Sequence, residues 1–288
     1  MKNSNINNNY QALKKITSQE ENQNWCQWLG GLIDASGQIV LKKDGEVFLE
    51  ISLETVNYHS LATIKHRLGG GHINVLGGNY TCQYKLSNVG PEVIKLINGH
   101  IRHPSKQEQL RDICNHFGIN YKPPLELTPI DFWISGVYES IGKCELNIED
   151  LSISITLTDR NEHILTEVCR VLGGRLVYYR ASNGTYKLHF QKKEELERLF
   201  NYFDHNSFKI KSAPQIKLVP EFYKILMEYE KKGNTDSELP LYIWECFLKL
   251  WNQHKEEYYD NKNLKNIENA LENSFKKDKI KIYNSNFD

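Results

Sequence analysis

Two stretches of the chain alternate strictly between apolar and polar side chains, which predicts half-buried β-strands. Over residues 47–54 and again over residues 151–158, every second side chain is a large aliphatic one. Each strand therefore has one face for a core and one polar face that stays open. A typical hairpin-turn sequence, KDGE at residues 43–46, precedes the first strand. Helices are predicted over residues 58–68 and 162–172, and each is followed by glycines that end it.

The chain also repeats itself, with an offset of 104 residues. Residues 51–61 (ISLETVNYHSL) and 155–165 (ITLTDRNEHIL) share five amino acids at matching positions, and residues 68–70 and 172–174 both read LGG. A further helix, predicted over residues 22–36, begins the first repeat. We therefore predict an α+β fold of two pseudo-symmetric αββαββα repeats, each with a four-stranded antiparallel sheet that helices cover on one face.

This pattern divides the chain into four parts. Residues 1–20 are rich in Asn and poor in apolar side chains, which indicates an N-terminal arm. The first repeat is expected over residues 21–125 and the second over residues 126–230. Residues 231–288 then form a linker and a helical extension, in which residues 241–252 carry large apolar groups on almost every side. That helix either packs back onto the second repeat or docks onto a partner, and the sequence favours neither.

Composition narrows the class of protein. The chain has 288 residues, which allows two domains with cores of their own, and 36 basic residues balance 36 acidic ones. A protein that relies on neutralising phosphates is usually basic, so neutrality lowers the expectation of a tight DNA binder that acts alone. The six cysteines are scattered, and we expect reduced thiols rather than a zinc site or disulfides. No apolar run predicts a membrane span or a secretory leader.

Each repeat begins with a helix that carries small residues in succession. Residues 28–37 read WLGGLIDASG, and residues 133–142 read WISGVYESIG. Small side chains let two helices pack closely, so the duplication favours a pseudo-twofold axis between these helices. Both segments resemble the signature of the LAGLIDADG family of homing endonucleases and intron maturases, in its single-chain form with two repeats. The resemblance covers roughly residues 22–230.

The resemblance implies that the two motif helices form the interface between the repeats. The interface residues expected on this basis are Gly30, Gly31, Asp34, Ser135, Gly136 and Glu139. In the family, an acidic residue before the last glycine of each motif binds divalent metal between two scissile phosphates. Those positions are Ser36 and Ile141 here, and the remaining acids Asp34 and Glu139 point to another side of their helices. We therefore expect no metal, no cofactor and no nuclease activity.

The resemblance also implies that nucleic acid lies against the open sheet faces, with basic residues near the ends of the repeats close to the former cleavage site. The residues expected to contact nucleic acid are Lys42, Lys85, Lys106, Arg175, Lys187, His189 and Lys209. Glu50 and Glu54 lie on the same polar face of the first sheet, where they repel phosphates.

We expect this chain to be an RNA-binding structural subunit of an organellar ribonucleoprotein, with the mitochondrial ribosome as the first choice. It would be monomeric, would not contact a membrane, and would bind rRNA or intron RNA together with neighbouring proteins. Three alternatives remain open: an intron maturase or splicing cofactor without cleavage activity, an active DNA homing endonuclease with an atypical site, and a DNA-binding regulator. The abundance of Asn, Lys, Ile and Tyr is typical of an AT-rich genome, which favours a mitochondrial protein and is compatible with a gene in the organelle itself.

Overall fold

A computed structural model describes residues 3–76, 80–180, 184–206, 214–231 and 244–252. It contains two four-stranded antiparallel sheets, with strand orders β1-β2-β4-β3 and β5-β6-β8-β7. The two orders are the same, so the second sheet repeats the topology of the first. The α+β fold with two repeats is thereby confirmed.

The first repeat follows the predicted order. Its elements are α1 (Asn3–Ser36), β1 (Gly37–Leu41), β2 (Val47–Glu54), the short 3-10 helix η1 (Thr55–Asn57), α2 (Tyr58–Leu68), β3 (His72–Leu76), β4 (Thr81–Leu86), α3 (Pro91–Ile97) and α4 (Pro104–His116). The bounds of β2 and α2 coincide with the predicted ones, and Gly45 occupies the turn before β2 with φ +88°.

The second repeat has the same order, with additional helices at its end. Its elements are α5 (Trp133–Ile141), β5 (Gly142–Asn147), β6 (Ser152–Asp159), α6 (Glu162–Leu172), β7 (Arg175–Tyr179), β8 (Thr185–Phe190), α7 (Lys193–His205), α8 (Pro214–Lys217) and α9 (Val219–Lys231). The strand predicted over residues 151–158 lies one residue later, because Leu151 takes a left-handed φ of +46° that belongs to a turn.

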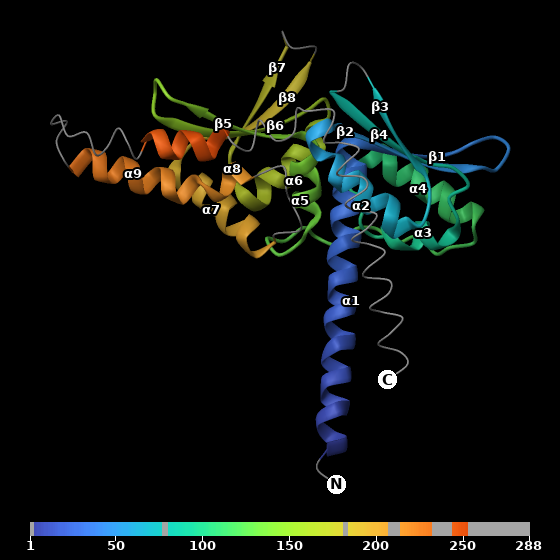
Figure 1. The fold of residues 1–288 in the computed structure, drawn as a ribbon. Helices are drawn as coiled ribbons and strands as arrows, with labels where there is room; N and C mark the ends of the chain where they lie inside the picture. The colour runs from blue at the N-terminus through green and yellow to red at the C-terminus, as the bar shows by residue number, and fades with distance from the viewer. Residues whose placement is uncertain (1–2, 77–79, 181–183, 207–213, 232–243, 253–288) are drawn as a thin grey trace.

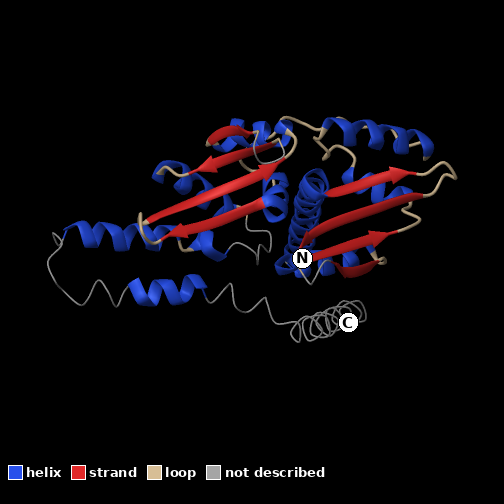
Figure 2. Cartoon of the chain, turned by 90° about the horizontal axis from the view of Figure 1, so that it is seen from above, coloured by secondary structure: helices blue, strands red, loops and turns tan. Residues whose placement is uncertain are grey.

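The first helix is longer than predicted. It begins at Asn3 instead of residue 22, so most of the expected N-terminal arm is helical backbone. Residues 3–29 contain neither glycine nor proline, and nothing in that stretch therefore interrupts the helix. Figure 1 shows α1 running away from the two sheets as a long rod. Figure 2, seen from above, shows α1 end-on between the sheets.

Each sheet covers a core of its own. The buried face of β2 contributes Val47, Leu49, Ile51 and Leu53, all at most 2% exposed, to the first core. The corresponding face of β6 contributes Ile153, Ile155 and Leu157 to the second. In Figure 1 the helices lie below the sheets, which leaves the upper, polar face of each sheet open.

The C-terminal apolar helix packs back onto the second repeat. Its described part spans residues 244–252. Phe247 and Trp251 are each 2% exposed and belong to the second core, and the rings of Trp244 and Phe247 contact Phe222 of α9. The first of the two alternatives for this segment is therefore confirmed for the described residues. No helix in the described part of the chain is long and apolar enough to cross a membrane.

Candidate functional site: the paired motif helices and the open sheet faces

The motif helices α1 and α5 touch through glycine. A Cβ placed on Gly31 would lie 2.0 Å from the carbonyl oxygen of Trp133, and one placed on Gly136 would lie 2.1 Å from that of Trp28. No other residue fits at either position, because the obstacle is backbone rather than a flexible side chain. Gly31 and Gly136 therefore lie in the interface between the repeats, as predicted.

Gly30 and Ser135 face their own repeats, contrary to the prediction. A Cβ on Gly30 would meet His100, in the loop between α3 and α4. The hydroxyl of Ser135 is within 3.2 Å of Tyr202 Oη and donates to the carbonyl of Asn206, both at the end of α7. Successive helical residues are about 100° apart, so only one of two adjacent small residues can face the partner helix.

The motif acids form a crossed pair of hydrogen bonds between the repeats. The indole of Trp28 donates to Glu139 Oε2 at 2.9 Å, and the indole of Trp133 donates to Asp34 Oδ2 at 2.9 Å. Asp34 and Glu139 are 1% and 3% exposed, so both carboxyl groups are held inside the interface. Both acids therefore lie between the two motif helices. The two tryptophans were not singled out from the sequence, although they occupy the same place in both motifs.

The two acids differ in their remaining partners. Asp34 also accepts hydrogen bonds from the backbone amides of Arg102, at 2.6 Å, and His103, at 3.1 Å. Burial raises the pKa of Asp34 to about 6, against these hydrogen bonds, which favour the ionised form. Glu139 accepts instead from the Ser60 hydroxyl, and burial raises its pKa to about 8. At pH 7 Asp34 is therefore mostly ionised and Glu139 mostly protonated.

The positions that the family fills with metal-binding acids are neutral here. Ser36 Oγ donates to Ser140 Oγ across the interface at 3.0 Å and is also 3.3 Å from the carbonyl oxygen of Leu32. Ile141 packs against the second core. Hard divalent cations need anionic or carbonyl oxygens, and two hydroxyls beside an aliphatic side chain do not fit one. Among the described residues no three potential metal-ligating side chains lie together.

The side chain of Lys106 caps the C-terminal end of the first motif helix, α1. Its Nζ donates to the carbonyl oxygens of Ile33, at 2.7 Å, and Asp34, at 2.6 Å, in the last turn of α1. A cation at this end of a helix also interacts favourably with the helix dipole. The structure thus gives Lys106 a role in the fold, whereas Lys209, its counterpart, lies outside the described residues.

We expect replacing Lys106 with alanine to lower the free energy of unfolding by about 2 kcal/mol, because two charge-assisted hydrogen bonds are lost. Chemical denaturation followed by circular dichroism measures this. Lys95, an exposed lysine of α3, is the matched control, and its alanine variant should unfold like the wild type. Equal stability of the Lys106 variant and the control would contradict the capping role.

The predicted cations of the first sheet are already paired. Lys85 Nζ lies 3.2 Å from Glu50 across β2 and β4. Lys42 forms an ion pair with Glu46 beside the β1–β2 turn. Glu54 faces the same open surface and pairs with Lys143 of the second repeat, at 3.6 Å. The open face of the first sheet consequently offers little positive charge to a phosphate.

The open face of the second sheet is basic and aromatic. The antiparallel register places Arg175 opposite His189, with Lys187 two residues away on β8. The Lys187 ammonium lies 5.0 Å from the centroid of the Tyr179 ring, and the Tyr179 hydroxyl is 3.1 Å from His189 Nε2. Burial, together with Lys187 and Arg175, lowers the pKa of His189. Three of the predicted residues thus lie together, with Tyr179 as a fourth member that the alternation of β7 could have indicated.

Comparisons with known proteins agree with this fold. The LAGLIDADG endonuclease family model matches residues 131–223. An intron-encoded DNA endonuclease of Dictyostelium discoideum, ai2a, is 29% identical over 248 residues, which cover 83% of this chain and 78% of the relative. An intron-encoded RNA maturase of Saccharomyces cerevisiae, bI4, is 26% identical over 246 residues, which cover 82% of this chain and 38% of the maturase. The relatives named here are endonucleases and a maturase, and a ribosomal role stays a prediction.

Solved structures share the fold. The homing endonuclease I-GzeII in complex with its DNA target has a TM-score of 0.50 and 17% identity, and the match covers 79% of this chain and 97% of the endonuclease. The meganuclease I-SmaMI bound to uncleavable DNA has a TM-score of 0.52 and 12% identity, over 77% of this chain and 96% of the meganuclease. With the two motifs, the crossed acids and the duplicated sheets, this chain is similar in sequence and in fold to the LAGLIDADG family of intron-encoded endonucleases and maturases.

Proposed function

We propose that this chain binds intron RNA as a maturase and does not cleave nucleic acid. The observation that carries the proposal is the hydrogen bond between Ser36 and Ser140, beside Ile141, where the family's metal ligands are expected. A metal clamp stabilises the attacking and leaving oxygens in phosphodiester hydrolysis, and its loss removes several kcal/mol of transition-state stabilisation. Because about 1.4 kcal/mol corresponds to a tenfold change in rate, cleavage would fall by orders of magnitude.

The basic open face of the second sheet supports a protein that binds nucleic acid without cleaving it. Arg175 and Lys187 are suited to phosphates, and His189 and Tyr179 offer hydrogen bonds and a ring. The relatives include both a DNA endonuclease, ai2a, at 29% identity and an RNA maturase, bI4, at 26%. RNA is the proposed ligand because binding to RNA does not require the metal-dependent cleavage that Ser36 and Ile141 disfavour. Relatives named as intron-encoded also fit the organellar location expected from the composition.

A cleavage and binding assay on the purified chain tests the proposal. The probes are RNA transcribed from the region flanking its gene and duplex DNA of the same sequence, with Mg²⁺ or Mn²⁺ present. We expect a gel shift with the RNA and intact DNA, while I-GzeII on its own target serves as a positive control for cleavage. Specific DNA cleavage that a chelator abolishes would refute the proposal, and so would binding to DNA but not to RNA.

Replacing Lys187 with alanine should weaken RNA binding at every RNA sequence, because it removes a phosphate contact. The slope of log K against log salt should become shallower by about 0.7 to 1. Lys85→Ala is the matched control on the first sheet, and it should change the affinity less than about twofold, because Glu50 already neutralises that lysine. Fluorescence anisotropy over a salt series measures both. A larger effect of the Lys85 variant would place the RNA on the other sheet.

A further inference from the structure

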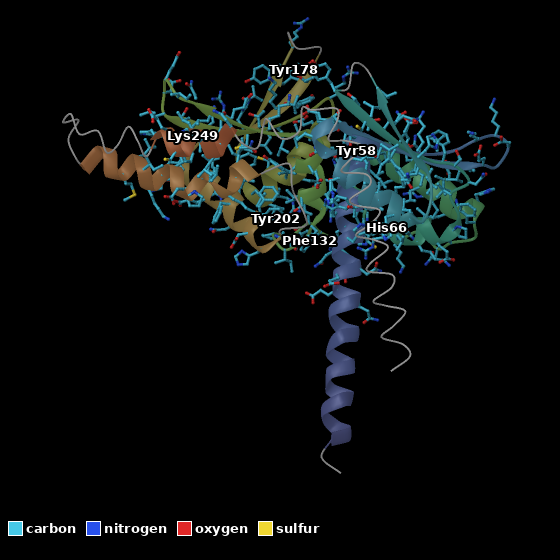
Figure 3. All side chains as sticks on the ribbon, viewed as in Figure 1. Tyr58, His66, Phe132, Tyr178, Tyr202 and Lys249 are labelled. Atoms are coloured by element: carbon cyan, nitrogen blue, oxygen red, sulfur yellow. The ribbon has the colours of Figure 1, made fainter. Side chains whose placement is uncertain are left out.

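The outer hairpin of the second sheet exposes an aromatic pair on the face opposite the basic one. The rings of Tyr178 and Tyr186 face each other across β7 and β8, with centroids 4.8 Å apart and planes tilted by 46°. Tyr186 is half-buried, but Tyr178 is 53% exposed. Figure 3 shows Tyr178 at the outer end of the sheet, far from the labelled Phe132 and Tyr202. An exposed ring held by a second ring is a preformed surface for a flat ligand.

The first repeat shows that the fold does not need this pair. The corresponding cross-strand positions there are Val75 and Cys82, the last pair but one before the loop of the hairpin, as Tyr178 and Tyr186 are in the second sheet. Cys82 is fully buried, and Val75 is 42% exposed. The same place in the duplicated architecture is thus filled by a valine and a buried cysteine in one repeat and by an aromatic pair in the other. Tyr178 is an addition specific to the second repeat.

The side chains around the β7–β8 hairpin carry positive charges, which suit the phosphates of a nucleic acid. β7 is the edge strand of its sheet, so a ligand can pass around it from one face to the other. Arg175 and Lys187 lie on the open face, and the exposed Arg180 directly follows β7. A strand whose phosphates lie against this basic side can turn a base toward the reverse face, where Tyr178 lies. A base paired within a duplex is already stacked on its neighbours and has no free face for a side chain.

We propose that Tyr178, supported by Tyr186, stacks against an unpaired base of the bound RNA while Arg175 and Lys187 hold the adjacent phosphates. The inference rests on the proposed RNA binding and adds a specificity: an RNA with unpaired nucleotides binds more tightly than a fully paired one. Aromatic stacking accepts any base, so the preference is for strandedness and not for sequence.

The test compares two fluorescein-labelled probes, a single-stranded RNA of mixed sequence and the blunt duplex of the same strand. Tyr178→Ala should weaken binding to the single strand by roughly 5- to 150-fold, the range for loss of one stacked base, and binding to the duplex by less than about twofold. Tyr178→Phe keeps the ring and should bind like the wild type. Tyr80, 70% exposed beside the first sheet's outer hairpin, is the matched control, and its alanine variant should leave both affinities unchanged.

The outcomes separate the inference from the proposed function. If the wild type binds neither probe, the proposed RNA binding fails. If the wild type binds RNA but Tyr178→Ala loses affinity for neither probe, or for both equally, the stacking site is refuted and RNA binding stands. A loss in Tyr80→Ala as large as that in Tyr178→Ala also refutes the assignment to this hairpin. Thermal unfolding by circular dichroism confirms that each variant is folded, and ultraviolet crosslinking of the single strand should be lost in Tyr178→Ala.

Discussion

Replacing Gly136 with alanine is expected to lower the free energy of unfolding by at least about 3 kcal/mol, at the upper end of the range for overpacking. The new methyl group would lie 2.1 Å from the carbonyl oxygen of Trp28 and 2.8 Å from the amide of Leu32. Both obstacles are backbone of α1, so relief requires the two motif helices to separate. That movement would stretch the hydrogen bonds of Asp34 and Glu139 at the same time.

Urea denaturation followed by circular dichroism measures this loss, and Gly70→Ala is the matched control. A Cβ on Gly70 would meet only the tip of Leu86, at 3.4 Å, so the control should stay within about 0.5 kcal/mol of the wild type. Gly31→Ala should behave like Gly136→Ala, because its methyl group would lie 2.0 Å from the carbonyl oxygen of Trp133. A fully stable Gly136→Ala variant would show that the repeats do not meet through these glycines.

The stability of the chain is expected to fall as the pH rises toward 8, because of Glu139. Its pKa is raised from 4.5 to about 8, so the folded chain keeps a proton that the unfolded chain releases. The free energy of unfolding therefore decreases with pH between these two values, with a slope that approaches about 1.4 kcal/mol per pH unit, and levels off above the folded pKa. Asp34, raised from 3.8 to about 6, contributes a similar decrease at lower pH.

Two substitutions separate these contributions. Glu139→Gln cannot ionise and should remove the decrease between about pH 6 and pH 8. Asp34→Asn should leave that decrease in place and make the slope below about pH 6 shallower, because Glu139 still contributes there. Urea denaturation at a series of pH values measures both slopes, with the wild type measured in parallel. A wild-type stability that rises between pH 6 and 8, or a Glu139→Gln profile with the wild-type slope, would contradict the burial of a protonated Glu139.

Much of the fold follows from local patterns. The alternation in β2 and the glycines after α2 and α6 predict the bounds of those elements, because each pattern records a local requirement of the backbone or of one buried face. The predicted start of α1 was wrong. Residues 1–20 have few apolar side chains, which indicated an arm, and no glycine or proline before Gly30 shows where the helix begins.

The candidate site is less accessible to sequence reasoning. The small residues of the motifs predict that two helices approach each other, but the rotation of each helix decides that Gly31 faces the partner while Gly30 faces His100. Likewise, the sequence shows that Lys106 carries a positive charge, but it does not show whether its ammonium group faces solvent or binds the last carbonyl oxygens of α1, as it does in the structure. Partners that come from distant parts of the chain, such as Trp133 and Asp34, leave no local periodicity. The Tyr178–Tyr186 pair is close in sequence, but it depends on the register of the β7–β8 hairpin, which the sequence analysis did not predict.

The crossed indole bonds also constrain how the chain can fold during synthesis. The first repeat is synthesised first, so Asp34 has no hydrogen bond from the indole of Trp133 until the second repeat has been made. Glu139 of the second repeat, in contrast, finds its donors Trp28 and Ser60 in the first repeat, which already exists. Domains usually fold one at a time as they emerge, and a buried acid without its donor disfavours that course. Each repeat thus supplies an indole donor to the buried acid of the other, and a repeat made alone would leave its motif acid without that donor.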